Sequence, residues 1–165
     1  MANNLPSDEQ SLRAYLRPKI LIIVQTILEN IKKSNVEQIN QIVYGAGTPT
    51  EYIRTYQFRD FAWDATVTKN TLYETEGEFK YNPEAEGMKP HLSLRKYHDQ
   101  PPGINENEYL AEIIYEGVAG HIFGEGFWTK PRDAWTKLVE IVGSDTMKNW
   151  IDQGARKARL AISWN

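Results

Sequence analysis

Residues 116–135, with the sequence EGVAGHIFGEGFWTKPRDAW, contain the residue types of a ligand-binding loop. They include four glycines, one histidine, two tryptophans and charges of both signs. A phosphate-binding loop needs the pattern GxxxxGK, then serine or threonine, after a buried strand. This segment has no such lysine, carries Glu125, which would repel a phosphate, and follows an expected helix. We therefore interpret it as a helix–helix connection in which glycines permit positive φ angles.

The histidines do not have the spacing of a metal site. His91, His98 and His121 form neither an i, i+4 pair nor an HExxH motif. The absence of cysteine excludes disulfides, thiolate nucleophiles and cysteine-ligated metals, and no GxSxG motif is present. The sequence therefore predicts no catalytic residue, no cofactor and no metal, and we do not expect an enzyme. A small hydrolase that pairs one of these histidines with a carboxylate stays an alternative.

The charged residues do not indicate a catalytic site or a nucleic-acid-binding site either. Glu74, Glu76 and Glu78 alternate along one expected strand face, which is typical of a solvated face or a charged lumen. A glycosidase-like carboxylate pair stays open because distances decide it. The net charge of −3 shows no basic excess, so we do not expect sequence-specific binding of nucleic acid.

Length and composition predict one folded domain. The 165 residues can bury a sizeable core, and the 41% hydrophobic and 25% charged residues are ordinary for a globular protein. The polar N-terminus resembles neither a signal peptide nor a transit peptide. The most apolar run, Ile20–Val24, is too short to cross a bilayer. We therefore expect a soluble, single-domain protein (residues 1–165) that does not bind membranes.

Long helices are expected in the N-terminal part of the chain. Ser7–Gln10 has the form of a capping box, and apolar residues then recur every three or four positions. Pro18 either kinks this helix or begins a second one. Ser34–Asn35 is expected to end it, and Val36–Tyr44 to form another short helix.

A β-hairpin near residues 58–80 is expected next. Residues 61–68 alternate between apolar and polar, Lys69–Asn70 can turn the chain, and Thr71–Phe79 can return as a second strand. Residues 80–106 contain several prolines and predict a long loop.

Three C-terminal helices complete the expected α+β fold. The first is capped by Asn105 or Asn107 and ends before Gly117. The second starts near Pro131, and Ser144 can cap the third.

One stretch resembles a known family. Residues 42–56 read IVYGAGTPTEYIRTY, which is similar to the VY, TPT, Y and RTY pattern of small neck proteins in long-tailed bacteriophages. These are head–tail connector or tail-completion proteins, also described as minor capsid or minor tail proteins. The later segments YLAEIIYEGVAG and IFGEGFWTKPRDAW are similar to the family's helix, glycine-containing loop and closing helix. The likeness covers roughly residues 7–160, and residues 80–106 and the tryptophan-rich loop depart from it.

The resemblance implies a structural virion protein without a cofactor. It also implies an α+β fold in which the C-terminal helices pack on a small antiparallel sheet. The protein would form a homo-oligomeric ring, of about six or twelve copies, that joins the head connector to the tail. The ring would dock on adjacent neck, portal-side or tail-tube proteins, and DNA would pass through its lumen without sequence-specific binding. The protein would be made in the host cytoplasm and reside in the virion. A tail-terminator or minor capsid protein is the nearest alternative, and a monomeric binding module belongs to another class.

Aromatic loops and extended arms are the segments expected to make the ring contacts. The candidate arms are residues 1–6 and residues 160–165. The expected interface residues lie in two loops and are Thr48, Pro49, Arg54, Tyr56, Phe123, Phe127, Trp128 and Arg132.

Overall fold

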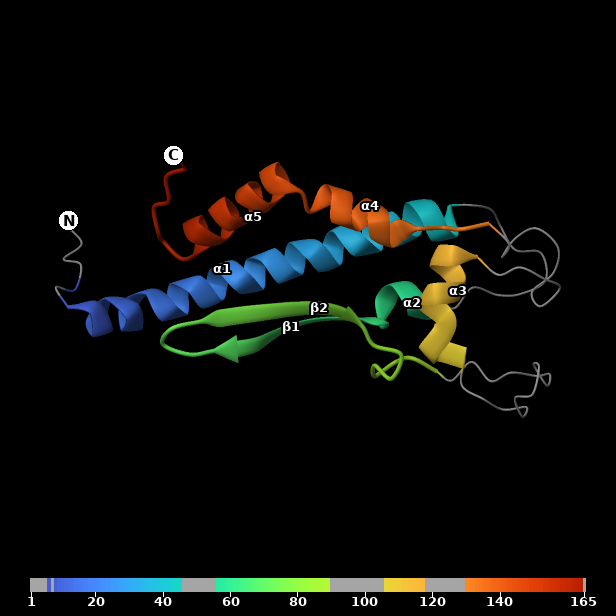
Figure 1. Ribbon diagram of the computed structural model, residues 1–165, viewed down its shortest axis with the longest axis horizontal. Helices are drawn as coiled ribbons and strands as arrows, with labels where there is room; N and C mark the ends of the chain where they lie inside the picture. Colours follow the sequence, from blue (N-terminus) through green and yellow to red (C-terminus); the bar gives the residue numbers. More distant parts are fainter. Residues whose placement is uncertain (1–5, 7, 46–55, 90–105, 118–129, 165) are drawn as a thin grey trace. The chain divides into compact units, whose positions relative to one another are not determined.

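The computed structural model describes residues 6, 8–45, 56–89, 106–117 and 130–164. These residues form the α+β fold expected from the sequence, with a long N-terminal helix, a two-stranded antiparallel sheet and C-terminal helices (Figure 1). The elements in chain order are α1 (Glu9–Gln38), a π-helix (Ile39–Tyr44), α2 (Gln57–Asp60), β1 (Trp63–Asn70), β2 (Thr75–Tyr81), a 3₁₀ helix (Glu106–Tyr109), α3 (Leu110–Glu116), α4 (Ala134–Ile141) and α5 (Ser144–Lys157).

The chain divides into two compact units. Unit 1 comprises Met1–Lys33, Ala65–Phe79 and Ile141–Asn165, and unit 2 comprises Ser34–Asp64 and Lys80–Glu140. The helix α1 and both strands contribute residues to each unit. The expectation of a single domain stays a prediction.

Helix α1 begins where the capping pattern places it, but Asp8 is the capping residue. The Oδ1 atom of Asp8 accepts a hydrogen bond from the Ser11 backbone N–H at 2.8 Å. This bond lowers the pKa of Asp8 below its ordinary value, because it stabilises the carboxylate. Ser7 lies outside the described residues.

The predicted helix end at Ser34–Asn35 is wrong. Helix α1 includes Pro18 and continues to Gln38, where the π-helix follows without a gap. Asparagine usually ends helices because its side chain bonds to nearby backbone. Asn35 is instead fully buried, and among the described residues its amide has no hydrogen-bond partner. The bond from the asparagine side chain to nearby backbone, which would compete with the helix, is therefore absent at Asn35.

The hairpin has a longer turn than the sequence predicted. Lys69 and Asn70 belong to β1, so the predicted turn at these residues is wrong. The turn is built on Thr71, whose N–H donates to the Glu74 carbonyl at 2.8 Å and whose Oγ1 accepts the Glu74 N–H at 3.1 Å. A threonine hydroxyl can stabilise a turn in this way. Lys69 then pairs with Glu74 and, at 3.7 Å, with Glu76 on the solvated face of β2.

The helix ends in the C-terminal part partly follow the predictions. Gly117 ends α3 with a φ of 75°, as expected. Helix α4 starts at Ala134, after Pro131, and Asp133 caps it by accepting the Thr136 N–H at 2.8 Å. Ser144 is the first residue of α5 and Gly143 occupies the N-cap position, so the predicted cap at Ser144 is wrong.

In unit 1 the hairpin and α5 pack on different faces of α1 (Figure 1). A β-carbon added to Gly77 of β2 would lie 2.9 Å from side-chain atoms of both Val24 and Leu28. A β-carbon added to Gly154 of α5 would lie 2.7 Å from the Cα of Ile23. Both glycines therefore permit a close approach to α1, one against side chains and the other against backbone.

These two glycines give a matched pair of substitutions. Gly154→Ala should lower the free energy of unfolding by about 1–3 kcal/mol, because its methyl group meets helix backbone that cannot move alone. Gly77→Ala should cost less, since the side chains of Val24 and Leu28 can rotate away. Urea unfolding measures both, with the exposed Asn149→Ala as a control on α5. Equal losses at the two glycines would contradict the assigned packing.

Candidate interaction site at Tyr56

Two of the eight expected interface residues are described. Tyr56 is partly exposed at 39%, and Arg132 is buried at 6%. The Arg132 N–H donates to the Ile114 carbonyl at 3.0 Å, so Arg132 joins the start of α4 to α3. The other six expected residues lie outside the described residues.

Tyr56 is held in a strained backbone conformation. Its φ of 57° lies in the left-handed region, which is unfavourable for a residue with a bulky side chain. The carbonyl of Tyr56 accepts the N–H groups of Arg59 and Asp60, each at 3.0 Å. Tyr56 is therefore the residue that starts α2, and the short helix fixes its direction.

Arg59 clamps this start of α2 through three contacts. Its guanidinium bonds both oxygens of the neighbouring Asp60 carboxylate, at 2.6 and 2.8 Å, and its Nη1 donates to Oδ1 of Asn40 at 2.9 Å. The Arg59 Cζ lies 4.6 Å from the centre of the Tyr56 ring. The hydrogen bonds to Asp60 raise the pKa of Arg59 further above its ordinary value. The guanidinium therefore links α2, the π-helix and Tyr56 with a permanent positive charge.

Tyr44 completes the cluster from the last position of the π-helix. Its ring centre lies 4.7 Å from that of Tyr56, with an angle of 56° between the planes. The two tyrosines that flank residues 46–55, on either side in the sequence, are therefore neighbours in space. A π-helix is uncommon, and such turns are frequent at functional sites. We call Asn40, Tyr44, Tyr56, Arg59 and Asp60 the Tyr56 cluster.

Aromatic packing supports the Tyr56 cluster from within unit 2. Phe58, on α2, is buried against three aromatic rings at centre distances between 5.6 and 5.9 Å. The indole planes of Trp63 and Trp135 are stacked within 13°. The aromatic core of unit 2 consists of Phe58, Trp63, Tyr81 and Tyr115, and the exposed Trp135 stacks on its edge.

Polar contacts also hold α2 in place. The Gln57 side-chain oxygen accepts the Lys89 N–H at 3.0 Å, and the Lys89 carbonyl accepts the buried Asn107 amide at 3.1 Å. The Asn107 carbonyl in turn accepts the Tyr81 hydroxyl. This chain of hydrogen bonds ties the helix that carries the cluster to the 3₁₀ helix and to β2.

The sequence named Tyr56 as an expected interface residue, which stays a prediction, and did not name the residues that contact it. Arg59 and Asp60 are adjacent in the sequence, which is a weak sign of a charged pair. Asn40 could not be found from the sequence, because only the π-helix turns it toward Arg59. Periodicity predicted a helix here but not its wider turn.

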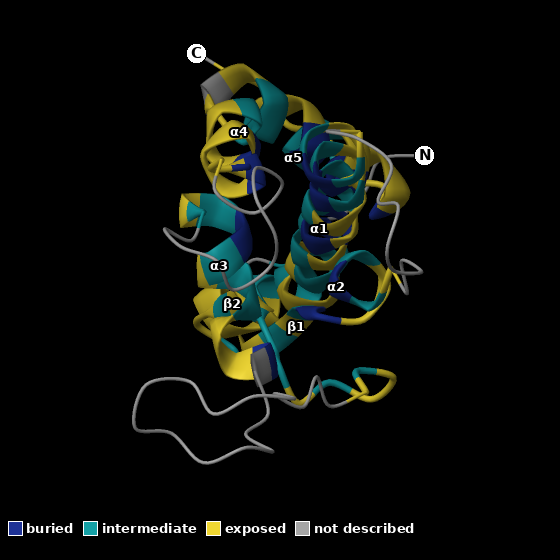
Figure 2. Cartoon of the chain, turned by 90° about the vertical axis from the view of Figure 1, so that its right-hand side faces the viewer, coloured by how far each residue is buried: buried dark blue, intermediate teal, exposed yellow. Residues whose placement is uncertain are grey.

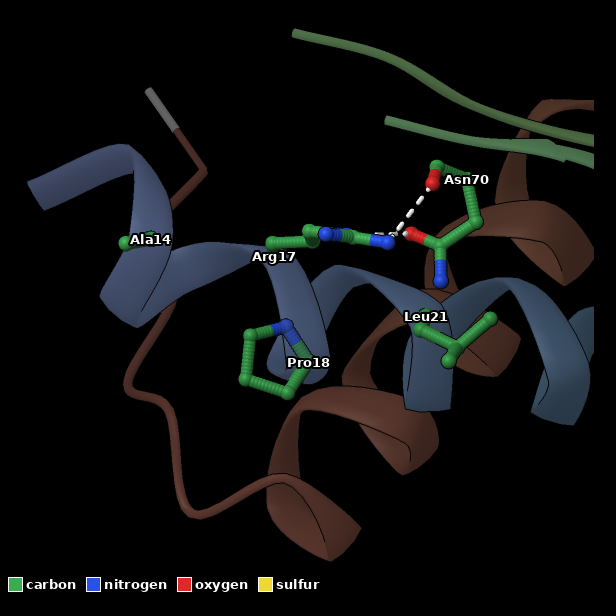
Figure 3. Close-up of a pocket in the computed structure, with 5 residues that line it drawn as sticks. All are labelled: Ala14, Arg17, Pro18, Leu21 and Asn70. Atoms are coloured by element: carbon green, nitrogen blue, oxygen red, sulfur yellow. Dashed lines mark hydrogen bonds between the residues drawn. The ribbon is translucent and has the colours of Figure 1, made fainter. Parts of the chain in front are cut away.

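Unit 1 contains a shallow hollow, of about 310 Å³, lined by α1 and the end of β1. Arg17 extends from α1 and donates to the Asn70 carbonyl at 2.8 Å and to its Oδ1 at 3.2 Å (Figure 3). The rest of the lining consists of Ala14, Pro18 and Leu21. These contacts fasten the hairpin end to α1, and we assign the hollow no ligand.

No group of three potential metal-ligating side chains occurs among the residues that the structure describes. The three histidines all lie outside those residues. Within the same part of the chain, no helix is long and apolar enough to span a bilayer.

Comparisons with protein-family models, with curated proteins and with solved structures found no match for this chain.

The contacts of Arg59 predict that replacing it with lysine lowers the free energy of unfolding more than the same replacement at Arg156. Arg59→Lys keeps the charge but loses the paired bonds to Asp60 and the planar contact with Tyr56. Because these groups are partly solvated, the free energy of unfolding should fall by only about 1 kcal/mol. Arg156→Lys on α5 is the matched control, and urea unfolding that shows no difference between the two would refute the clamp.

The aromatic core predicts two classes of tyrosine in an alkaline titration. Burial raises the pKa of Tyr81 to about 12, and that of Tyr115 also lies above the ordinary 10.0. The neutral phenols therefore contribute stability that is complete below pH 10 and is lost as the pH rises toward 12. Phenolate absorbance should rise in two stages, and Tyr81→Phe should shrink the later one. A single stage at the ordinary pKa would contradict the burial.

Proposed function

We propose that this protein is a structural subunit of the neck of a long-tailed bacteriophage. It forms a homo-oligomeric ring that joins the head connector to the tail, and the Tyr56 cluster contributes to a contact with a neighbouring subunit or ring. The alternatives of a tail-terminator or minor capsid protein share this assembly role.

One observation carries the proposal. The stretch that resembles the neck family runs from Ile42 to Tyr56, and the two described tyrosines that flank its central TPT sequence contact each other at 4.7 Å. Residues of this stretch and of α2 therefore meet in one aromatic and charged cluster. Tyrosine and arginine are enriched in protein–protein interfaces, where they combine apolar area with directed hydrogen bonds.

Further apolar side chains on unit 2 support an assembly role. Tyr109, Trp135 and Val139 are exposed, and the last two lie four residues apart on one face of α4. Figure 2 colours the exposed residues of α4 yellow and its buried ones dark blue. Exposed aromatic and aliphatic groups of this kind are typical of surfaces that bind other proteins.

Rigidity favours the Tyr56 cluster as a contact site. A side chain already fixed by Arg59 loses little conformational entropy when a partner covers it. The backbone strain at Tyr56 is maintained by the bonds to α2, which is a common arrangement at binding sites.

The oligomeric state tests the proposal. Light scattering over a range of concentrations should detect closed rings, and imaging of whole particles should place the protein at the neck. A chain that stays monomeric at every concentration and is absent from assembled particles would overturn the proposal. A metal bound tightly by the purified chain would instead favour the hydrolase.

Two substitutions should separate contact residues from core residues. Tyr56→Ala and Trp128→Ala should reduce ring formation at least tenfold, while helical circular dichroism is retained. Tyr73→Ala, at the exposed hairpin turn, is a control of the same residue type. Loss of helical signal in Trp128→Ala would assign that residue to the core.

A further inference from the structure

The C-terminal residues 159–164 fold back on α5 in a specific way. The Trp164 Nε1 atom donates to Oδ1 of Asp152 at 2.9 Å, and the Lys148 Nζ lies 6.0 Å from the centre of the indole ring. Asp152 and Lys148 are four residues apart, so they lie on one face of α5. We call residues 160–164 the arm, and Lys148 and Asp152 its seat.

The arm is joined to α5 by a strained turn. The Leu160 N–H donates to the Ala155 carbonyl at 2.8 Å and the Arg159 N–H to the Arg156 carbonyl at 3.1 Å, which is a Schellman motif. The position with positive φ in this motif usually holds glycine, but here it is Arg159, with a φ of 53°. Returning Arg159 to an extended conformation would relieve this strain and release the arm.

The residues before the turn are fixed to the body of unit 1. Lys19 of α1 donates to the Ala158 carbonyl at 2.8 Å, and Lys157 pairs with Glu29 at 3.3 Å. A change of backbone conformation at Arg159 alone would therefore release the arm. Even in its own seat the arm leaves Ile162 and Trp164 exposed, the latter at 48%, so its contacts with the body are weak.

We propose that the arm is exchanged between copies of this chain. In the exchanged form Arg159 is extended, and Trp164 of one copy binds Asp152 and Lys148 of a second copy. The contacts of Trp164 with Asp152 and Lys148 form in both states. Extending Arg159 removes its positive φ and breaks the two backbone hydrogen bonds of the turn, whose N–H groups then bind water. An extended arm from residue 159 to residue 164 reaches about 17 Å, which limits exchange to adjacent copies.

Local concentration decides which state is populated. A single chain keeps its arm in its own seat, because that seat is always near. Copies held side by side offer each arm a second seat at about millimolar effective concentration, so binding to the seat of a neighbour then competes with binding to its own. This inference stands on the contacts of residues 148–164 and does not require the neck function.

The absence of cysteine in the chain permits a direct test. Asn149→Cys marks the seat and Ser163→Cys marks the arm, and both positions are exposed. The two single variants are mixed at millimolar concentration and treated with a short bismaleimide. We expect a cross-linked species that contains one chain of each variant. The double variant in dilute solution should cross-link within one chain, which establishes that the linker reaches from arm to seat.

Hinge substitutions should change the exchange in opposite directions. Arg159→Gly accepts the positive φ and should reduce the mixed cross-link, whereas the β-branched Arg159→Val should increase it, with about tenfold between the two. Trp164→Ala, added to the arm variant, should abolish the mixed product.

Three outcomes would overturn the proposal. The first is cross-linking within single chains only, at every concentration tested. The second is a mixed product that persists after Trp164→Ala, which would indicate random collision. The third is a double variant that does not cross-link at all, which would contradict the seat itself.

Discussion

The close approach of α5 and the hairpin to α1 is the constraint on which unit 1 depends. Gly154 lets the α5 backbone approach the α1 backbone at Ile23, and Gly77 lets β2 approach Val24 and Leu28. Hydrogen bonds from Arg17 to Asn70 and from Lys19 to Ala158 then fix the ends of the hairpin and of α5. Packing on two faces explains how α1 stays continuous through Pro18, since tertiary contacts supply most helical stability in proteins.

Unit 2 is organised around aromatic side chains and one arginine. Phe58 and Trp63 place α2 and the start of β1 on a buried aromatic core, and Gln57 braces α2 through Lys89. With α2 fixed, Arg59 can bind Asp60, reach the π-helix and cover the Tyr56 ring at the same time. The exposed part of the cluster is therefore rigid because its base is buried.

Two non-glycine residues in the described part of the chain have positive φ angles, Tyr56 and Arg159. Tyr56 begins α2, and Arg159 follows the end of α5. The ring of Tyr56 itself and that of Trp164, five residues after Arg159, are partly exposed. Strain of this kind persists only where the surrounding contacts maintain it. At Tyr56 the contacts with Arg59 hold the ring in one position. At Arg159 the arm that follows is held by Trp164, which stays 48% exposed.

Local sequence patterns determined the main elements of this fold. Apolar periodicity predicted a long N-terminal helix, alternation predicted the hairpin, and Gly117 was correctly placed at the end of α3. These features could be predicted from the sequence because helix capping, the spacing of apolar side chains and the conformations open to glycine depend on only a few neighbouring residues. The same reasoning failed at Asn35 and at Lys69–Asn70, where burial and the Thr71 hydroxyl decided the backbone.

The candidate site could be predicted only in part. The TPT and RTY pattern pointed to Tyr56, but nothing in the sequence joined Asn40 to Arg59 or Trp164 to Asp152, because those pairs meet only after helices have packed and turned. Likewise, Arg132 looked like a surface residue in a loop, and its burial against α3 follows from the tertiary structure. The sequence by itself located the long N-terminal helix, the hairpin and the C-terminal helices, since those preferences are local, but it missed α2, which lies where the hairpin was expected to begin. Only the tertiary structure decided which side chains share a surface, since contacts between distant residues depend on how the elements pack.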